Sequence, residues 1–149
     1  MRVLLAHNFY RSRAPSGEDF VFRNEKALLS DKGVDFVTYE MFNDKIDTSS
    51  FAHLARLVLN TACSNGAYNA VGHLIKQTKP DIAHFHNTFP QISPSAYATC
   101  RDSGVPVVQT LHNFRFDCPG GLLLRDGNPC EDCVGTNLLP AMRQRCYRG

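Results

Sequence analysis

Residues 1–40 read MRVLLAHNFYRSRAPSGEDFVFRNEKALLSDKGVDFVTYE, and this stretch contains the pattern that decides the fold. Residues 3–6 (VLLA) are apolar without polar alternation, which is typical of a strand that is covered on both faces in a parallel sheet. Residues 34–39 predict a second short strand, and the segment between the two has apolar residues at helical spacing. Strand, loop, helix and strand in this order form the unit that builds parallel sheets with right-handed crossovers.

The helix is predicted over residues 18–32, after a loop over residues 7–17. Gly33 follows the helix directly, in the position where glycine commonly ends one. The apolar side of this helix is expected to recur at spacings of three and four and to comprise Phe20, Val21, Asn24, Ala27 and Leu28.

The alternation of helices and strands continues along the chain. Helices are predicted over 51–62, 68–77, 94–103 and 139–145, and strands over 81–86 and 105–111. Four strands that alternate with helices indicate the α/β class, with a Rossmann-like, doubly wound and mainly parallel sheet. We expect one domain over residues 1–149, within which residues 113–149 form an irregular, cysteine-rich segment.

The composition limits the class of function. Hydrophobic residues make up 43% of the chain and charged residues 20%, as in globular proteins. The formal net charge of +2 and the scattered basic residues argue against a nucleic-acid partner. No apolar run approaches the ~20 residues of a membrane span, and the apolar start is too short for a signal peptide. We therefore expect a cytoplasmic location.

Three predicted strands finish in or near histidine and asparagine: His7-Asn8, His84 to Asn87, and His112-Asn113. Ligands of open α/β sheets bind beyond the carboxyl ends of the strands. Imidazole and carboxamide groups offer both donors and acceptors, which suits sugar hydroxyls and phosphate oxygens. Any one of these histidines fits a purely structural role equally well, so it is their recurrence at one edge that favours binding.

The loop Pro15-Ser16-Gly17-Glu18 precedes the first helix. A glycine there lets the backbone approach a phosphate, and the N–H groups and dipole of the helix favour anions. The alternative is an ordinary helix start with Ser16 as the N-cap. The second and third glycines of a GxGxxG fingerprint are missing, which argues against a dinucleotide enzyme.

Four of the six cysteines, Cys118, Cys130, Cys133 and Cys146, follow the spacing C-x11-C-x2-C-x12-C. The C-x2-C pair suits two of the four thiolates of a tetrahedral structural zinc site. Free or disulfide-paired thiols and an iron–sulfur cluster are the alternatives. Buried apolar positions are expected for Cys63, directly after the helix predicted over 51–62, and for Cys100, within the helix predicted over 94–103.

Three long stretches resemble a known family. They are "MRVLLAHNFY…SGEDFVFRNEKALLSDKGVDFVTYE", "KPDIAHFHN" and "VPVVQTLHNFRFDCPGGLLLRDGNPCEDC…RCYRG". They are similar to the N-terminal domain of retaining glycosyltransferases of family 4 (group 1), which adopt the GT-B fold. The resemblance covers nearly the whole chain, and the last stretch resembles a bacterial polysaccharide-type subgroup most closely.

The resemblance implies an acceptor-binding domain of an enzyme of hexosyltransferase type, whose C-terminal donor-binding domain is absent from this chain. It implies a UDP- or GDP-sugar donor, a sugar or lipid-linked acceptor, and transfer with retained configuration that requires no catalytic metal. Peripheral association with the inner face of the membrane fits a lipid-linked acceptor. We expect this chain alone to be inactive and to have no nucleic-acid partner.

The resemblance also implies roles for individual residues. His112 is expected to be the catalytic residue, because it matches the histidine that stabilises charge on the transferred sugar. The substrate- and donor-binding residues are expected to be Ser16, Gly17, Glu18, His86, Asn87 and Asn113. Where the family often has two adjacent glycines this chain has Ser16-Gly17, which reduces the freedom of the backbone. The alternative to an enzyme is a non-enzymatic, zinc-stabilised α/β interaction module.

Overall fold

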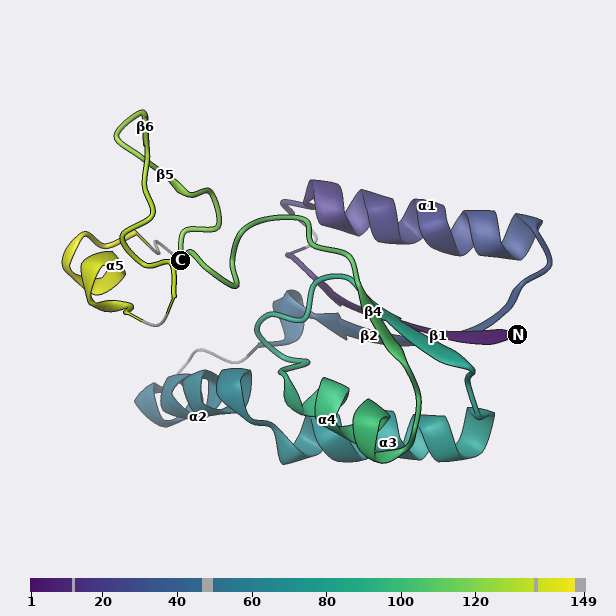
Figure 1. Cartoon of the computed structure of the whole chain (residues 1–149). Coiled ribbons are helices and arrows are strands. Elements are labelled where there is room, and N and C mark those ends of the chain that lie inside the picture. Colours follow the sequence, from purple (N-terminus) through teal and green to yellow (C-terminus); the bar gives the residue numbers. More distant parts are fainter. Residues whose placement is uncertain (12, 47–49, 136, 147–149) are drawn as a thin grey trace. The chain divides into compact units, whose positions relative to one another are not determined.

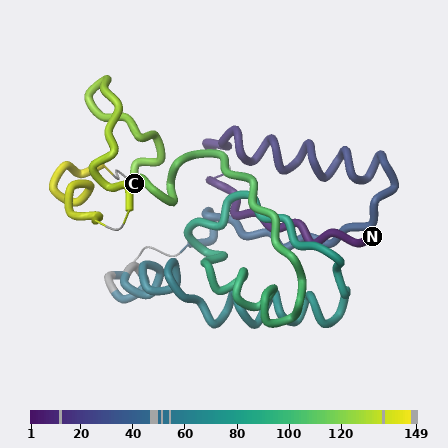
Figure 2. Tube along the Cα trace, in the orientation of Figure 1, coloured from purple at the N-terminus to yellow at the C-terminus, as the bar shows by residue number. Residues whose placement is uncertain are grey.

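The computed structural model describes residues 1–11, 13–46, 50–135 and 137–146. Parts of the predicted first loop and of the cysteine-rich segment, at Ser12, Thr136 and residues 147–149, lie outside the described residues. The chain forms two compact units, Met1–Thr110 and Leu111–Gly149. Figures 1 and 2 show the sheet with its helices in the first unit and short elements in the second.

The first unit is built on a four-stranded sheet in which every pair is parallel. The strands are β1 (Arg2–Phe9), β2 (Asp35–Phe42), β3 (Ile82–Phe85) and β4 (Val107–Gln109), in the order β2-β1-β3-β4. β1 pairs with β2 along its whole length and with β3 from Val3 to Ala6. The predicted Rossmann-like α/β class is confirmed.

β1 is longer than predicted. It continues to Phe9, so His7 and Asn8 lie within the strand and not in the loop expected over residues 7–17. Residues 3–9 are all buried, because β1 lies between two other strands and is covered on both faces. The expected buried strand is therefore confirmed, but its end was placed too early.

Helices cover both faces of the sheet (Figure 1). α1 (Gly17–Asp31) packs on one face, and α3 (Asn65–Thr78) and α4 (Ser95–Asp102) pack on the other. α2 (Phe51–Ala62) and the short 3-10 helix η1 (Asn43–Lys45) lie between β2 and α3 in the chain. The doubly wound arrangement is therefore confirmed.

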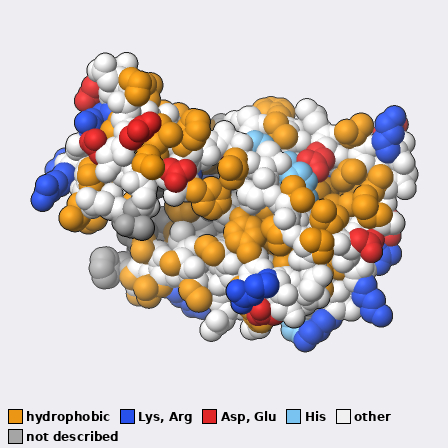
Figure 3. Space-filling model, viewed as in Figure 1, with side chains coloured by type: hydrophobic (Ala, Val, Ile, Leu, Met, Phe, Trp, Pro, Cys, Tyr) orange, Lys and Arg blue, Asp and Glu red, His pale blue; other side chains and the backbone are white. Residues whose placement is uncertain are grey.

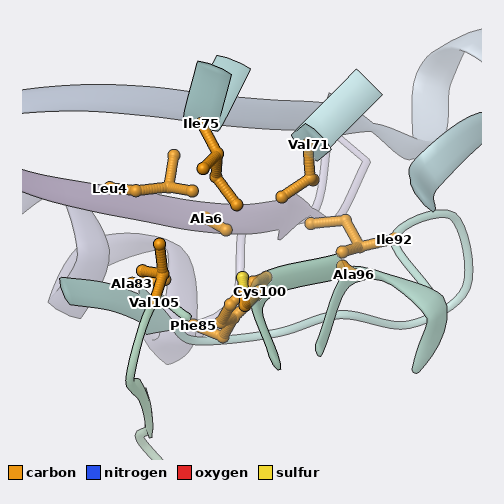
Figure 4. Close-up of a cluster of buried hydrophobic side chains, with 10 residues drawn as sticks. All are labelled: Leu4, Ala6, Val71, Ile75, Ala83, Phe85, Ile92, Ala96, Cys100 and Val105. Atoms are coloured by element: carbon orange, nitrogen blue, oxygen red, sulfur yellow. The ribbon is translucent and has the colours of Figure 1, made fainter. Parts of the chain in front are cut away.

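Two apolar clusters fill the spaces between the helices and the sheet. Figure 4 shows the larger, formed by Leu4, Ala6, Val71, Ile75, Ala83, Phe85, Ile92, Ala96, Cys100 and Val105. The cluster beneath α1 is smaller and contains Val3, Leu5, Phe9 and Phe22. Successive residues of β1 alternate between the two clusters, as the pleat of a strand requires.

The face of α1 that meets the sheet is not the predicted one. Phe20, Val21 and Leu28 are 54%, 44% and 56% exposed, whereas Asp19 and Phe22 are buried. The apolar spacing was misleading because one of the buried positions is a carboxylate, which is stabilised by hydrogen bonds and not by apolar contacts. The sheet-facing side of α1 is therefore partly polar.

The second unit contains little regular structure, as predicted for the cysteine-rich segment. β5 (Leu124–Arg125) and β6 (Asn128–Pro129) form an antiparallel hairpin, and α5 (Leu139–Arg143) follows. Both residues of the hairpin turn, Asp126 and Gly127, have positive φ angles, as tight hairpin turns commonly require. In the described part of the whole chain, no helix combines the length and apolar character needed to cross a bilayer.

Candidate functional site

The centre of the sheet contains a topological switch point between β1 and β3. From β1 the chain passes to β2 on one side and then returns to β3 and β4 on the other side. Ligands of open α/β sheets bind outside the carboxyl ends of the strands at such a point. The residues that follow these ends are Tyr10 after β1 and His86 after β3. The candidate site is therefore this edge together with the nearby start of α1.

His7 is a structural residue beneath α1. Its ring is fully buried and stacks on Phe22, with the ring centroids 4.8 Å apart. Its Nε2 lies 2.8 Å from Asp19 Oδ1, and its Nδ1 accepts the N–H of Asn87 at 3.3 Å. Because Nδ1 is an acceptor, the ring proton is on Nε2 and is donated to Asp19. His7 thus connects β1 with α1 and with the residues after β3.

Asp19 takes part in the N-terminal cap of α1. Its carboxylate accepts the N–H of Ser16 at 2.8 Å and of Tyr10 at 3.3 Å, and the Ser16 hydroxyl accepts the N–H of Asp19. This is a capping box, so the alternative of Ser16 as an ordinary N-cap is what the structure contains. Burial raises the pKa of Asp19, but hydrogen bonds from His7, Ser16 and Tyr10 outweigh it and lower the pKa below its usual value.

Gly17 stands at the first position of α1, where the surface is open. A Cβ atom placed on Gly17 would meet nothing within 4 Å, and Gly17 is not among the residues with positive φ. Neither packing nor backbone conformation therefore requires glycine here. The surface at this position is therefore open, and the close approach of another molecule to the backbone is sterically possible. Glu18 follows and is half-buried.

A second polar cluster lies beneath the middle of α1. Glu25 of α1 is placed between two histidines, with Oε1 2.6 Å from His84 Nδ1 and Oε2 3.0 Å from His86 Nε2. The side chains of His84 and His86 lie on the same face of the sheet because these residues are two positions apart at the end of β3. The side chain of His86 is fully buried, whereas His84 and Glu25 are 16% and 25% exposed. Figure 3 shows histidine side chains beside acidic ones at the surface.

The sequence indicated only part of this cluster. The alternation of His84 and His86 predicts that the two side chains share a face. Glu25, however, lies 59 residues before His84, and no local pattern indicates that it approaches β3. His86 was expected to line a ligand cleft, but its side chain is covered beneath α1 and contacts Glu25.

The asparagines connect the ends of β1 and β3. Asn87 donates its side-chain amide to the carbonyl of Asn8 at 2.8 Å and accepts the N–H of Phe89 at 3.1 Å. Asn8 in turn donates to Asn43 Oδ1 at 2.8 Å and accepts the N–H of Gln91 at 3.2 Å. These amides fix the loop at the switch point, so the expected ligand-binding role of Asn87 competes with a structural one.

His112 and Asn113 belong to the second unit, whereas the other predicted binding residues belong to the first. Asn113 accepts the N–H of Arg115 at 3.0 Å, which stabilises the turn that follows it. Both residues are half-buried within the described structure. The expected convergence of His112 with His86 stays a prediction.

All four cysteines of the predicted zinc site line one cavity of about 250 Å³ in the second unit: Cys118, Cys130, Cys133 and Cys146. None of them is in a disulfide. Burial raises the pKa of Cys118, but N–H groups of residues 120–123 that face its sulfur outweigh it and lower the pKa. This favours the thiolate form, which is the form that binds metals.

Within the described residues, the group of potential metal ligands whose atoms lie within 4.8 Å of one another is Glu25, His84 and His86. The cysteine sulfurs do not form such a group there. Of the two remaining cysteines, Cys100 is buried as expected, but Cys63 is exposed because it follows the last residue of α2. The expectation for Cys63 was therefore wrong.

The first unit thus contains the exposed start of α1, whose first turn carries Glu18 and Asp19, and a partly buried cluster of two imidazoles and a carboxylate. Comparisons of the chain with models of protein families, with curated proteins and with solved structures found no match.

Proposed function

We propose that this chain is the N-terminal, acceptor-binding domain of a nucleotide-sugar-dependent retaining glycosyltransferase of hexosyltransferase type. The observation that carries the proposal is the open start of α1 next to the switch point, where Gly17 leaves room for a ligand at the backbone. The resemblance of the sequence to retaining glycosyltransferases of family 4 supports it. The proposed setting is bacterial cell-surface polysaccharide biosynthesis in the cytoplasm, at the inner face of the membrane.

The proposed substrates are a UDP- or GDP-sugar and a sugar or lipid-linked acceptor. The first N–H groups of a helix have no intrahelical partner, and the helix dipole adds partial positive charge. The Ser16 hydroxyl accepts the N–H of Asp19, and Gly17 lies two residues before Asp19, at an exposed position of the same turn. Such groups stabilise the charge that develops on a departing diphosphate without having to reorganise.

In this proposal His112 is the catalytic residue that stabilises charge on the transferred sugar, with Asn113 beside it in the chain. Asn87 contributes the edge of the cleft. His86 supports that edge from beneath α1, because its buried side chain contacts Glu25 and its N–H donates to the carbonyl of Ala6. The paired glutamates typical of the family belong to a second domain.

A titration followed by nuclear magnetic resonance tests the proposal. We expect UDP-glucose or GDP-mannose to shift the amide signals of Gly17 and Glu18, and we expect Gly17→Ala to weaken this binding. Gly66→Ala is a matched control, because Gly66 is an exposed glycine in the first turn of α3. The proposal fails if neither sugar nucleotide shifts these signals, or if inorganic phosphate alone reproduces the effect with equal affinity.

We also propose that the four cysteines bind a structural zinc ion in the second unit. The cavity that they share supports this, and so does the small apolar interior of the described part of this unit. The hydrophobic residues buried in the described part of this unit are Cys133 and Ala141. Units this short usually need a metal or disulfides to fold. The sulfurs must move towards a common centre, since tetrahedral zinc holds thiolates at ~2.3 Å.

A compact cysteine-containing unit also fits the alternative function, a non-enzymatic interaction module stabilised by zinc. The sugar-nucleotide titration separates the two functions. A chain that binds zinc but shows no response at Gly17 to either sugar nucleotide supports the interaction module.

A further inference from the structure

We propose that Glu25, His84 and His86 form a three-ligand site for a divalent transition-metal ion of the zinc class. This site lies in the first unit, is separate from the cysteines, and does not rest on the proposed transferase function. Two imidazoles and one carboxylate are a common donor set for zinc, and also occur in iron(II) sites with open coordination positions.

The distances fit such an ion. Zinc binds imidazole nitrogen and carboxylate oxygen at ~2.0–2.2 Å, so ligand atoms around one ion lie roughly 3 to 3.5 Å apart. The Glu25 oxygens lie 2.6 Å from His84 Nδ1 and 3.0 Å from His86 Nε2. All three ligand atoms lie within 4.8 Å of one another. An ion therefore requires the facing Glu25 and His84 atoms to separate by about 0.5–1 Å.

The surroundings of the cluster also fit. The other ring nitrogen of His84, Nε2, lies 2.7 Å from the hydroxyl of Thr110, which fixes the ring orientation. Metal-binding histidines commonly have a partner of this kind on the nitrogen that does not bind the metal. The partial exposure of His84 and Glu25 leaves one side of the site open, so that water or an anionic oxygen can complete the coordination.

The alternative to a bound metal ion is protons on the imidazole nitrogens that face Glu25. Hydrogen bonds from protonated imidazole nitrogens to the two Glu25 oxygens produce the same short separations. Metal binding requires neutral imidazoles with lone pairs on Nδ1 of His84 and Nε2 of His86. Any protons on those atoms leave to solvent when the ion enters, and the His84 ring proton then lies on Nε2 and is donated to Thr110.

Cobalt(II) distinguishes the two occupants, because its unpaired electrons broaden or shift nuclear signals close to the ion. We expect Co²⁺ added to the metal-free, ¹⁵N-labelled chain to affect amides of β3 and of α1 near Glu25. The effect is assigned residue by residue, so binding at the cysteines appears separately on signals of residues 118–146. Zinc added first should prevent the effect of Co²⁺.

Two pairs of variants test the ligands. Glu25→Gln retains the size of the side chain but removes its charge and replaces one acceptor oxygen by an amide donor. We expect at least a tenfold loss of affinity for Co²⁺, since even outer-shell changes cost about 10–100-fold. Its control, Glu40→Gln, changes a residue that pairs with Lys26 of α1. His84→Ala should also abolish the effect at β3, whereas His73→Ala, at an exposed position of α3, should not.

The proposal is overturned if millimolar Co²⁺ leaves the β3 and α1 signals unchanged, or if Glu25→Gln binds as tightly as Glu40→Gln. Histidine ring signals that respond to pH but not to metal would identify a proton-occupied cluster, which also overturns it. Either result leaves the sugar-nucleotide test at Gly17 unaffected, so the two proposals fail separately.

Discussion

Replacement of Asp19 by alanine should destabilise the first unit more than any surface substitution. The carboxylate is 1% exposed and accepts three hydrogen bonds, from His7, Ser16 and Tyr10. Alanine leaves the buried Nε2–H of His7 without an acceptor, and such a buried donor costs about 1–3 kcal/mol. Loss of the capping box costs about 1 kcal/mol more, and the Tyr10 bond adds about 0.5–1 kcal/mol.

The expected loss is therefore about 2.5–5 kcal/mol of the free energy of unfolding, against a total of about 5–15 kcal/mol for a typical domain. With a urea m-value of about 2 kcal/mol per molar, the midpoint of unfolding should fall by about 2 M. Far-ultraviolet circular dichroism measures this midpoint, because helices and strands of the first unit dominate the signal.

Two further variants make the result interpretable. Asp35→Ala is the matched control, because Asp35 pairs with Arg2 on the surface and its side chain is 57% exposed, so the loss should stay below about 1 kcal/mol. Asp19→Asn retains an acceptor for His7 but turns an amide donor towards the N–H of Ser16, so it should fall between the two. If Asp19→Ala and Asp35→Ala unfold at the same urea concentration, the buried network does not stabilise this chain as we describe.

Three other predictions follow from single groups. The pKa of Asp19 lies below its usual value of 3.8. The contribution of the Asp19 carboxylate to stability is therefore fully present above about pH 4 and is lost as the pH falls through the folded-state pKa. Asp19→Asn should remove this part of the acid dependence of the urea midpoint. Burial raises the pKa of Cys100 to about 11, whereas the pKa of Cys118 is lowered, so iodoacetamide at pH 8 should label Cys118 before Cys100 in the metal-free chain. Peptide mass spectrometry can check this order, and faster labelling of Cys100 would contradict it. The purified chain should carry about one zinc ion at its cysteines. A chelator should disorder residues 113–146 while the amide signals of β1 to β4 persist. An absence of zinc in metal analysis would refute the structural zinc site.

The elements of the first unit could be predicted because their signals are local. Unbroken apolar runs indicated the buried strands, and Gly33 with a φ of +66° ends α1 as its position predicted. Serines cap the starts of α1, α2 and α3. Such short-range patterns identify which elements form, although the end of β1 was placed too early, and they do not state which side of an element faces a neighbour.

The polar interior could not be predicted, because it depends on pairs that are distant in sequence. Asp19 lies 12 residues from His7, and Glu25 lies 59 residues from His84. Hydrophobic spacing assigns an acidic residue to the solvent side of a helix, and this is why the buried face of α1 was placed on Phe20 and Val21. A carboxylate can take a buried position only when its partners are already in place, and the fold supplies them.

The two carboxylates of α1 have a consequence for the edge of the sheet. Apolar contacts are non-directional, whereas Asp19 bonds to His7 of β1, and Glu25 pairs with His84 of β3 and with His86 directly after that strand. These strands lie on the two sides of the switch point, so α1 is fixed to both of them at once. Its open first turn at Gly17 is thereby held beside the carboxyl ends of β1 and β3. The sugar-nucleotide site that we propose at this turn would therefore need no rearrangement before a ligand arrives, which lowers the cost of binding.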